Sequence, residues 1–171
     1  SFATWILKKR IHQMELFLKY PHEVQDELLL SLIKSAENTQ IGRKYDFSSM
    51  KNYTTFSDRI PVSTYEELEP LIELTRKGEQ NVFWHSNIKW FAKSSGTTNA
   101  KSKFIPVSSE ALENCHYKAS KDLLCLYLNN NEDSQLFTGK SLRLGGSKQL
   151  YEDNNTFFGD LSAILIDNMP I

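Results

Sequence analysis

The period of the hydrophobic pattern changes near Gly78, and this change limits the possible folds more than any other feature of the sequence. Before Gly78, apolar side chains recur at helical spacing in residues 3–19 and again in residues 21–38, where Pro21 suits a first helical turn. We expect a loop over residues 38–47 and a short helix over residues 51–58. The front of the chain is therefore predicted to be helical.

One further helix is expected before Gly78. Ser63 and Glu66 have the spacing of a capping box, in which each side chain satisfies an unpaired amide of the first helical turn. The helix that they open is expected to end at Gly78. The first eighty residues contain no motif that suggests catalysis or ligand binding. His12 and His22 are interpreted as surface residues because neither has a partner at metal-ligand spacing.

After Gly78 the apolar runs become short and alternate with polar segments. Residues 88–93 and 103–107 predict two strands, and Pro106 places the second strand at an edge or an end of a sheet. The polar loop between them, residues 94–102, contains no apolar residue except Ala100.

The rest of the chain predicts one long helix and further strand-like segments. Ser108 or Ser109 is expected to cap a helix that runs to about Leu128, residues 141–144 predict a third strand, and residues 157–166 form another apolar segment. This order predicts an α/β fold with a helical N-terminal layer followed by strands and a crossover helix. We divide the chain into a helical segment, residues 1–80, and an α/β segment, residues 81–171.

The composition excludes several classes of protein. Twenty Lys and Arg residues face 21 Asp and Glu residues, and a net charge of −1 argues against a nucleic-acid partner. No apolar run approaches the roughly 18 residues of a membrane-spanning helix, so no membrane partner is expected. Cys115 and Cys125 lie about 15 Å apart on the predicted helix, too far for a disulfide, and we therefore predict a cytoplasmic location.

The segment Lys93–Lys103 is the part of the sequence that suggests chemistry. It holds five hydroxyl side chains, one glycine and three lysines within eleven residues. Gly96 allows the backbone to turn sharply, and successive amides in such a turn form a concavity that suits an anion. Hydroxyls donate hydrogen bonds to phosphate oxygens, and lysine adds a positive charge. The segment therefore predicts an anion-binding loop, although the same residue types also build plain exposed turns.

Two other specific motifs do not fit this loop. A Walker loop needs a second glycine five residues after the first, but Lys101 stands five residues after Gly96. A Ser-x-x-Lys acylation site needs a serine three residues before a lysine, but Thr98 precedes Lys101 and Ala100 precedes Lys103 at that distance.

The loop and its context resemble a known family. Ser94-Ser95-Gly96-Thr97-Thr98 followed by Lys103 is similar to the phosphate-binding loop of adenylate-forming enzymes. Together with Asn38-Thr39-Gln40-Ile41-Gly42, Ile60-Pro61-Val62, Tyr65-Glu66-Glu67-Leu68 and Gly78-Glu79, in that order, it resembles the auxin-responsive acyl acid-amido synthetase family. We identify the chain as an N-terminal fragment of a bacterial-type member, containing part of the N-terminal domain of an adenylate-forming enzyme.

The resemblance implies a reaction, two substrates and a set of phosphate ligands. ATP and a carboxylic acid would form an acyl-adenylate with loss of pyrophosphate, and the amine of an amino acid would then form the amide. Mg²⁺ would bridge the phosphates. The residues that would bind the β- and γ-phosphates are Ser94, Ser95, Gly96, Thr97, Thr98 and Lys103. No catalytic residue or metal ligand is assigned. The sequence has Asn99 and Ala100 where the family often has glycines.

Family members are several hundred residues long, so this chain is expected to be one incomplete domain that is inactive alone. The uncovered apolar residues 161–166 are expected to cause self-association. Three functions remain open: a fragment of an adenylating ligase, a non-catalytic nucleotide- or anion-binding module, and a helical interaction domain.

Overall fold

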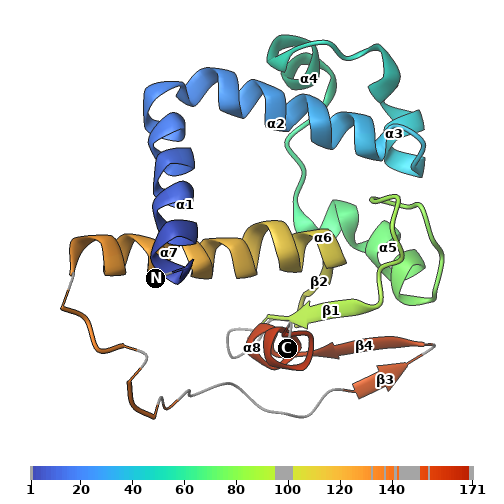
Figure 1. The fold of residues 1–171 in the computed structure, drawn as a ribbon. Helices are drawn as coiled ribbons and strands as arrows, with labels where there is room; N and C mark the ends of the chain where they lie inside the picture. Colours follow the sequence, from blue (N-terminus) through green and yellow to red (C-terminus); the bar gives the residue numbers. More distant parts are fainter. Residues whose placement is uncertain are drawn as a thin grey trace.

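The computed structural model describes residues 2–94, 102–131, 133–136, 138–140, 142, 151–153 and 155–169. The front of the chain is helical, as the sequence predicts, and Figure 1 shows it above the sheet. Its elements are α1 (Phe2–Lys19), α2 (Pro21–Ala36), α3 (Gln40–Lys44), the 3₁₀ turn η1 (Phe47–Ser49), α4 (Tyr53–Arg59) and α5 (Tyr65–Arg76). Within the described ranges, no helix is long and apolar enough to cross a bilayer.

A small mixed sheet follows the helical front. The described residues form four strands in the order β2-β1-β4-β3, in which β1 pairs with β2 antiparallel and with β4 parallel. The chain passes from β2 through a long helix before it returns to β3 and β4, so the predicted α/β fold with a crossover helix is confirmed. These elements are β1 (Trp90–Lys93), β2 (Phe104–Val107), α6 (Ser109–Ala111), η2 (Leu112–Tyr117), α7 (Lys118–Asn130), β3 (Tyr151–Asp153), β4 (Thr156–Gly159) and α8 (Leu161–Asp167).

Strand β1 is covered on both faces because successive side chains of a strand point to opposite sides. Phe91 is fully buried and packs with Ile72 of α5 on one face. Ala92 packs on the other face with Ile164 of α8 and Leu112 of η2. Among the described residues, strand β2 pairs only with β1 and lies at the edge of the sheet, where Pro106 was expected.

The first turn of α5 differs from the prediction by one residue. Thr64, not Ser63, is the N-cap: its hydroxyl accepts a hydrogen bond from the Glu67 amide at 3.3 Å, and the Glu67 carboxylate accepts one from the Thr64 amide at 2.7 Å. Ser63/Glu66 and Thr64/Glu67 have the same spacing, so the local pattern fits both. Glu66 therefore does not take part in the capping box that the sequence predicted for it.

The end of α5 follows the prediction closely. The helix ends at Arg76, and Gly78 has the left-handed φ of 94° that glycine adopts without strain. The Gly78 amide donates to the Thr75 carbonyl, and the Glu79 amide donates to the Leu74 carbonyl, both at 3.0–3.1 Å. This pair of bonds is a Schellman motif, which satisfies carbonyls that the helix end leaves unpaired.

The predicted loop over residues 38–47 is wrong in part, because α3 forms within it. Thr39 caps this helix by accepting a hydrogen bond from the Gly42 amide at 3.0 Å. Gly42 is required here, because a Cβ atom at this position would lie 2.1 Å from the Ala36 carbonyl oxygen. A five-residue helix is too short to show a hydrophobic period, and the sequence pattern therefore missed it.

Two further expectations concern the later elements. Ser108 caps the helical stretch 109–130, which is continuous as predicted but contains the π-helical segment η2. The predicted strand over residues 141–144 falls on a part of the chain that, except for Leu142, lies outside the described residues.

The apolar segment at residues 157–166 divides into β4 and α8. Ala163 and Ile164 of α8 are only 5 % and 0 % exposed, because Val107, Leu112 and their neighbours cover them. The chain thus buries one side of α8 itself, whereas Ile166 is 44 % exposed, and self-association through this segment stays a prediction.

Candidate functional site

The strands on either side of the polar segment 94–102 pair with each other. Lys93 at the end of β1 lies opposite Phe104 at the start of β2. One step further on, the Ser94 amide donates to the Lys103 carbonyl at 2.9 Å, and the Lys103 amide donates to the Ser94 hydroxyl at 3.1 Å. The structure therefore brings together the first and last residues of the predicted phosphate-binding set. Ser95, Gly96, Thr97 and Thr98 lie outside the described residues.

Two residues in the first turn of α5 contact Lys103 and Phe104, which follow the polar segment. The Lys103 ammonium lies 2.8 Å from a Glu66 carboxylate oxygen and 4.8 Å from the centre of the Tyr65 ring. The Tyr65 hydroxyl oxygen accepts a hydrogen bond from the Phe104 amide at 2.9 Å. The sequence does not place either residue at the site, because the contact joins positions nearly forty residues apart and Glu66 fits a local capping pattern.

The Lys103–Glu66 pair is open to water. The two side chains are 41 % and 66 % exposed. The hydrogen bond from Lys103, followed by a backbone hydrogen bond within Glu66, lowers the pKa of the Glu66 carboxyl, so this carboxylate is negatively charged at neutral pH. An exposed ion pair of this kind is weak and is screened by salt. The ammonium can therefore change its partner readily.

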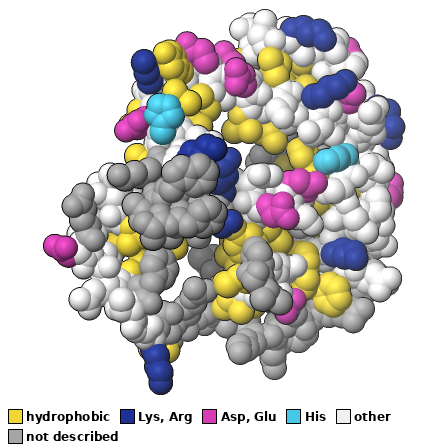
Figure 2. Space-filling view, viewed as in Figure 1, with side chains coloured by type: hydrophobic (Ala, Val, Ile, Leu, Met, Phe, Trp, Pro, Cys, Tyr) yellow, Lys and Arg dark blue, Asp and Glu magenta, His cyan; other side chains and the backbone are white. Residues whose placement is uncertain are grey.

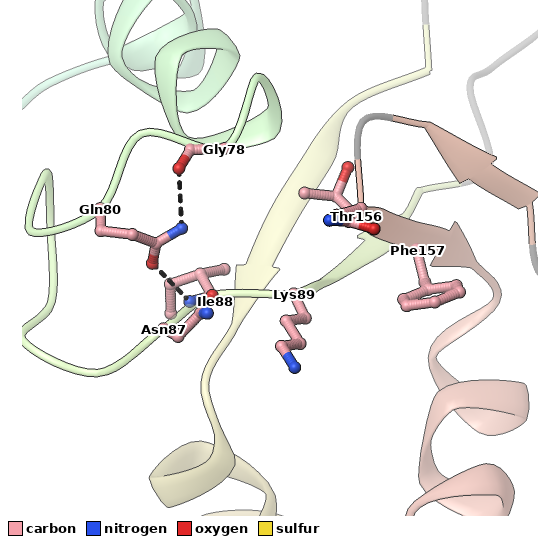
Figure 3. A pocket seen from close by; sticks show the side chains of 8 residues that line it. Gly78, Gln80, Asn87, Ile88, Lys89, Thr156 and Phe157 are labelled. Carbon is pink, nitrogen blue, oxygen red and sulfur yellow. Dashed lines mark hydrogen bonds between the residues drawn. The ribbon is translucent and has the colours of Figure 1, made fainter.

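A cleft of about 580 Å³ lies at the opposite end of the parallel strands from Ser94, where β1 and β4 begin. Figure 3 shows that the Gln80 side chain forms one wall, with its amide bonded to the Gly78 carbonyl at 2.9 Å and to the Ile88 amide at 3.3 Å. Both polar atoms of Gln80 are thus used to hold the segment before β1. The other lining residues are Asn87, Lys89, Asn155, Thr156 and Phe157.

A cluster around Glu110 connects the same segment to the start of α6. The Ser86 hydroxyl donates to the Glu110 carboxylate at 2.8 Å, and His85 Nε2 lies 3.7 Å from its other oxygen. Burial acts to raise the pKa of Glu110, but hydrogen bonds from its own backbone amide and from Ser86 outweigh burial and lower it. The part of the chain that the structure describes holds no group of three or more side chains suited to bind a metal ion.

The charged side chains are mixed over the surface. Figure 2 shows basic and acidic side chains interspersed on the face that it presents, with apolar side chains between them. The cysteines are both free, Cys115 exposed and Cys125 buried.

Comparison with known proteins identifies the family. The GH3 family N-terminal domain matches residues 10–169. This chain belongs to the GH3 family. The resemblance to the auxin-responsive amido synthetases is thereby confirmed, whereas membership of a bacterial type stays a prediction.

Similar proteins extend this assignment. The GH3 chain is 29 % identical over 106 residues to an indole-3-acetic acid-amido synthetase of Arabidopsis thaliana, covering 61 % of this chain and 19 % of that protein. It is 27 % identical over 143 residues to a jasmonoyl–L-amino acid synthetase of Nicotiana attenuata, covering 81 % of this chain and 24 % of the relative. The chain thus spans about a quarter or less of the length of these relatives.

A solved structure shares the fold. The acyl acid amido synthetase GH3.15 superposes with a TM-score of 0.75 over 92 % of this chain and 28 % of its own, at 22 % sequence identity. The arrangement of helical front, small sheet and crossover helix is therefore the fold of this part of that GH3 protein.

Proposed function

We propose that this GH3 chain supplies the phosphate-binding loop of an ATP-dependent ligase that joins a carboxylic acid to an amino acid. The observation that carries the proposal is the pairing of Ser94 with Lys103, which brings together the two ends of the predicted phosphate-binding set next to β1 and β2. Family membership and the names of the amido synthetases that the chain resembles support the reaction type.

The reaction has two steps. A carboxylate oxygen of the acid attacks the α-phosphorus of ATP, and pyrophosphate leaves with the electrons of the broken phosphoanhydride bond. The amine of the amino acid then attacks the activated carbonyl, loses a proton, and AMP leaves. The loop would bind the β- and γ-phosphates through Ser94, Ser95, Gly96, Thr97 and Thr98, and Lys103 would neutralise part of the charge on the departing pyrophosphate.

The described residues fit a phosphate ligand. Ser94 offers a hydroxyl and Lys103 an exchangeable ammonium, which are the donors that phosphate oxygens accept. Mg²⁺ commonly keeps several waters and is held through substrate phosphates with few protein ligands, so we propose that it binds with the nucleotide.

Adenylate formation needs the acid held in line with the α-phosphate, and such positioning contributes about 7–11 kcal/mol. We therefore propose that catalysis requires the whole synthetase and that the 171-residue chain alone is inactive.

The proposal also includes the division into residues 1–80 and 81–171, a cytoplasmic location, and the absence of nucleic-acid and membrane partners. We also propose that the chain self-associates through exposed apolar side chains, such as Leu28 and Leu123, which are 58 % and 68 % exposed.

The test is ATP–pyrophosphate exchange by the full-length synthetase with a panel of carboxylic acids. Lys103→Met is expected to lower exchange by about 10²–10³-fold, as for the loss of one preorganised donor, while unfolding stability changes by no more than about 0.5 kcal/mol. Lys121→Met, at an exposed lysine of α7, is the matched control and should leave exchange unchanged.

Three results would contradict the proposal. Unchanged exchange in the Lys103→Met variant would reject the role of this lysine. Absence of acid-dependent exchange in a folded parent that still binds pyrophosphate would favour the non-catalytic anion-binding module. Absence of both activities would favour the helical interaction domain.

A further inference from the structure

Two separate sets of contacts hold Lys103. Its backbone is fixed by the two hydrogen bonds to Ser94, and the next residue is fixed by the bond from the Phe104 amide to the Tyr65 hydroxyl. Its ammonium is held independently, by the Glu66 carboxylate at 2.8 Å. The head group can therefore change its partner while the backbone at the end of the loop stays in place.

Glu66 reaches the loop from a well-supported element. The capping box between Thr64 and Glu67 fixes the first turn of α5, in which Glu66 is the second residue. Further along the helix, the buried Ile72 packs with Phe91 of β1. The carboxylate is thus presented to the loop by a helix that is anchored in the core.

A phosphate and the Glu66 carboxylate compete for the same donor. Both are anions that accept hydrogen bonds from the three N–H groups of an ammonium, and two anions close to one lysine repel each other. Because Glu66 is 66 % exposed, its side chain can turn toward water without burying its charge. The exchange of partners therefore requires no rearrangement of the fold.

We propose that Glu66 is the resident counterion of Lys103, which holds the ammonium at the base of the loop until a bound phosphate displaces it. The inference rests on the phosphate-binding role proposed above for this loop. Glu66 acts as a positioning residue in the free protein and as a competitor for the incoming anion. The Tyr65 ring, 4.8 Å from the ammonium, remains beneath Lys103 when Glu66 leaves.

The test compares pyrophosphate binding by charge-matched variants of the 171-residue chain, measured by calorimetry at low ionic strength. Glu66→Gln and Glu66→Ala should each bind pyrophosphate about two- to five-fold more tightly than the unchanged chain, the range set by the strength of exposed ion pairs. Glu69→Gln removes the same charge from the same helix, at a carboxylate that has no ion pair within the described residues, and should have a smaller effect. In a Lys103→Met background, Glu66→Gln should no longer improve binding.

Each outcome decides between the two proposals. If the unchanged chain binds pyrophosphate no better than the Lys103→Met variant, the phosphate role of Lys103 fails, and the counterion inference fails with it. If Lys103→Met weakens binding but Glu66→Gln does not strengthen it, only the counterion inference is overturned. Far-ultraviolet circular dichroism of every variant checks that the fold is retained, which the exposure of Glu66 leads us to expect.

Discussion

Replacing Thr39 by Val tests how much a buried helix N-cap contributes to the stability of the protein. Thr39 is fully buried, and its hydroxyl accepts a hydrogen bond from the Gly42 amide at 3.0 Å while it donates one to the Ala36 carbonyl at 2.7 Å. Val has nearly the same shape but cannot do either. The Ala36 carbonyl keeps a bond from the Thr39 backbone amide, so the Gly42 amide alone loses its partner.

The expected loss of stability follows from that single unpaired amide. Removing an N-cap side chain costs about 0.5–2 kcal/mol, and leaving a buried donor unsatisfied costs about 1–3 kcal/mol. These two figures describe the same lost bond, so they overlap, and we expect a decrease of about 2 kcal/mol in the free energy of unfolding. With an m value of about 2 kcal/mol/M in urea, the unfolding midpoint should fall by about 1 M.

Thr64→Val is the matched control, because Thr64 also caps a helix but is exposed to water. Water can pair with the Glu67 amide after this change, so the loss should stay below about 1 kcal/mol. Equal midpoints for the two variants, or a shift of less than about 0.3 M for Thr39→Val, would refute the reasoning from burial. A changed m value would show that the substitution alters the compactness of the denatured or the native state instead.

Two further predictions concern the core and the contact between α1 and α7. Ile164→Ala should lower the free energy of unfolding by about 2–5 kcal/mol, measured in urea, because the side chain is completely buried beneath β1; a loss below about 1 kcal/mol would show that α8 is not part of the core. Arg10 of α1 forms a paired contact with Asp122 of α7 that lowers the pKa of the Asp122 carboxyl, first through the hydrogen bond. The stabilisation is therefore complete above the ordinary value of 3.8 and is lost as the pH falls through the lower pKa of the folded state. Asp122→Asn should decrease stability at pH 7 by about 1–2 kcal/mol, between the ranges for exposed and buried pairs, and this difference should shrink toward pH 2 in pH-dependent urea titrations.

Much of the fold follows from local sequence patterns. The helices before Gly78 show a helical period over sixteen or more residues in α1 and α2, long enough for the period to be unambiguous. The two strands beside the polar loop were predicted because apolar runs flank a segment of turn residues. Their pairing then places Ser94 beside Lys103 as a direct consequence of hairpin geometry.

Short elements and tertiary contacts could not be predicted from local sequence patterns. Helix α3 has five residues and α8 has seven, so neither shows enough of a period to be distinguished from a loop or a strand. The two overlapping capping boxes at Ser63 and Thr64 offer equivalent local hydrogen bonds. The observed register also places the Tyr65 hydroxyl against the Phe104 amide, a contact that joins α5 to β2 and that local sequence does not encode.

The two residues at the ends of the predicted phosphate-binding set, Ser94 and Lys103, are therefore supported in different ways. Ser94 follows a central strand that is packed on both faces, whereas Lys103 immediately precedes an edge strand that needs support from outside the sheet. Helix α5 provides that support with Tyr65, which fixes the backbone, and with Glu66, which holds the lysine head group. Because the backbone contact is a hydrogen bond to a partly buried amide and the head-group contact is an exposed ion pair, only the latter is easily exchanged. This division gives Lys103 a fixed backbone together with an exchangeable head group, which is what the proposed transfer of the ammonium to a phosphate requires.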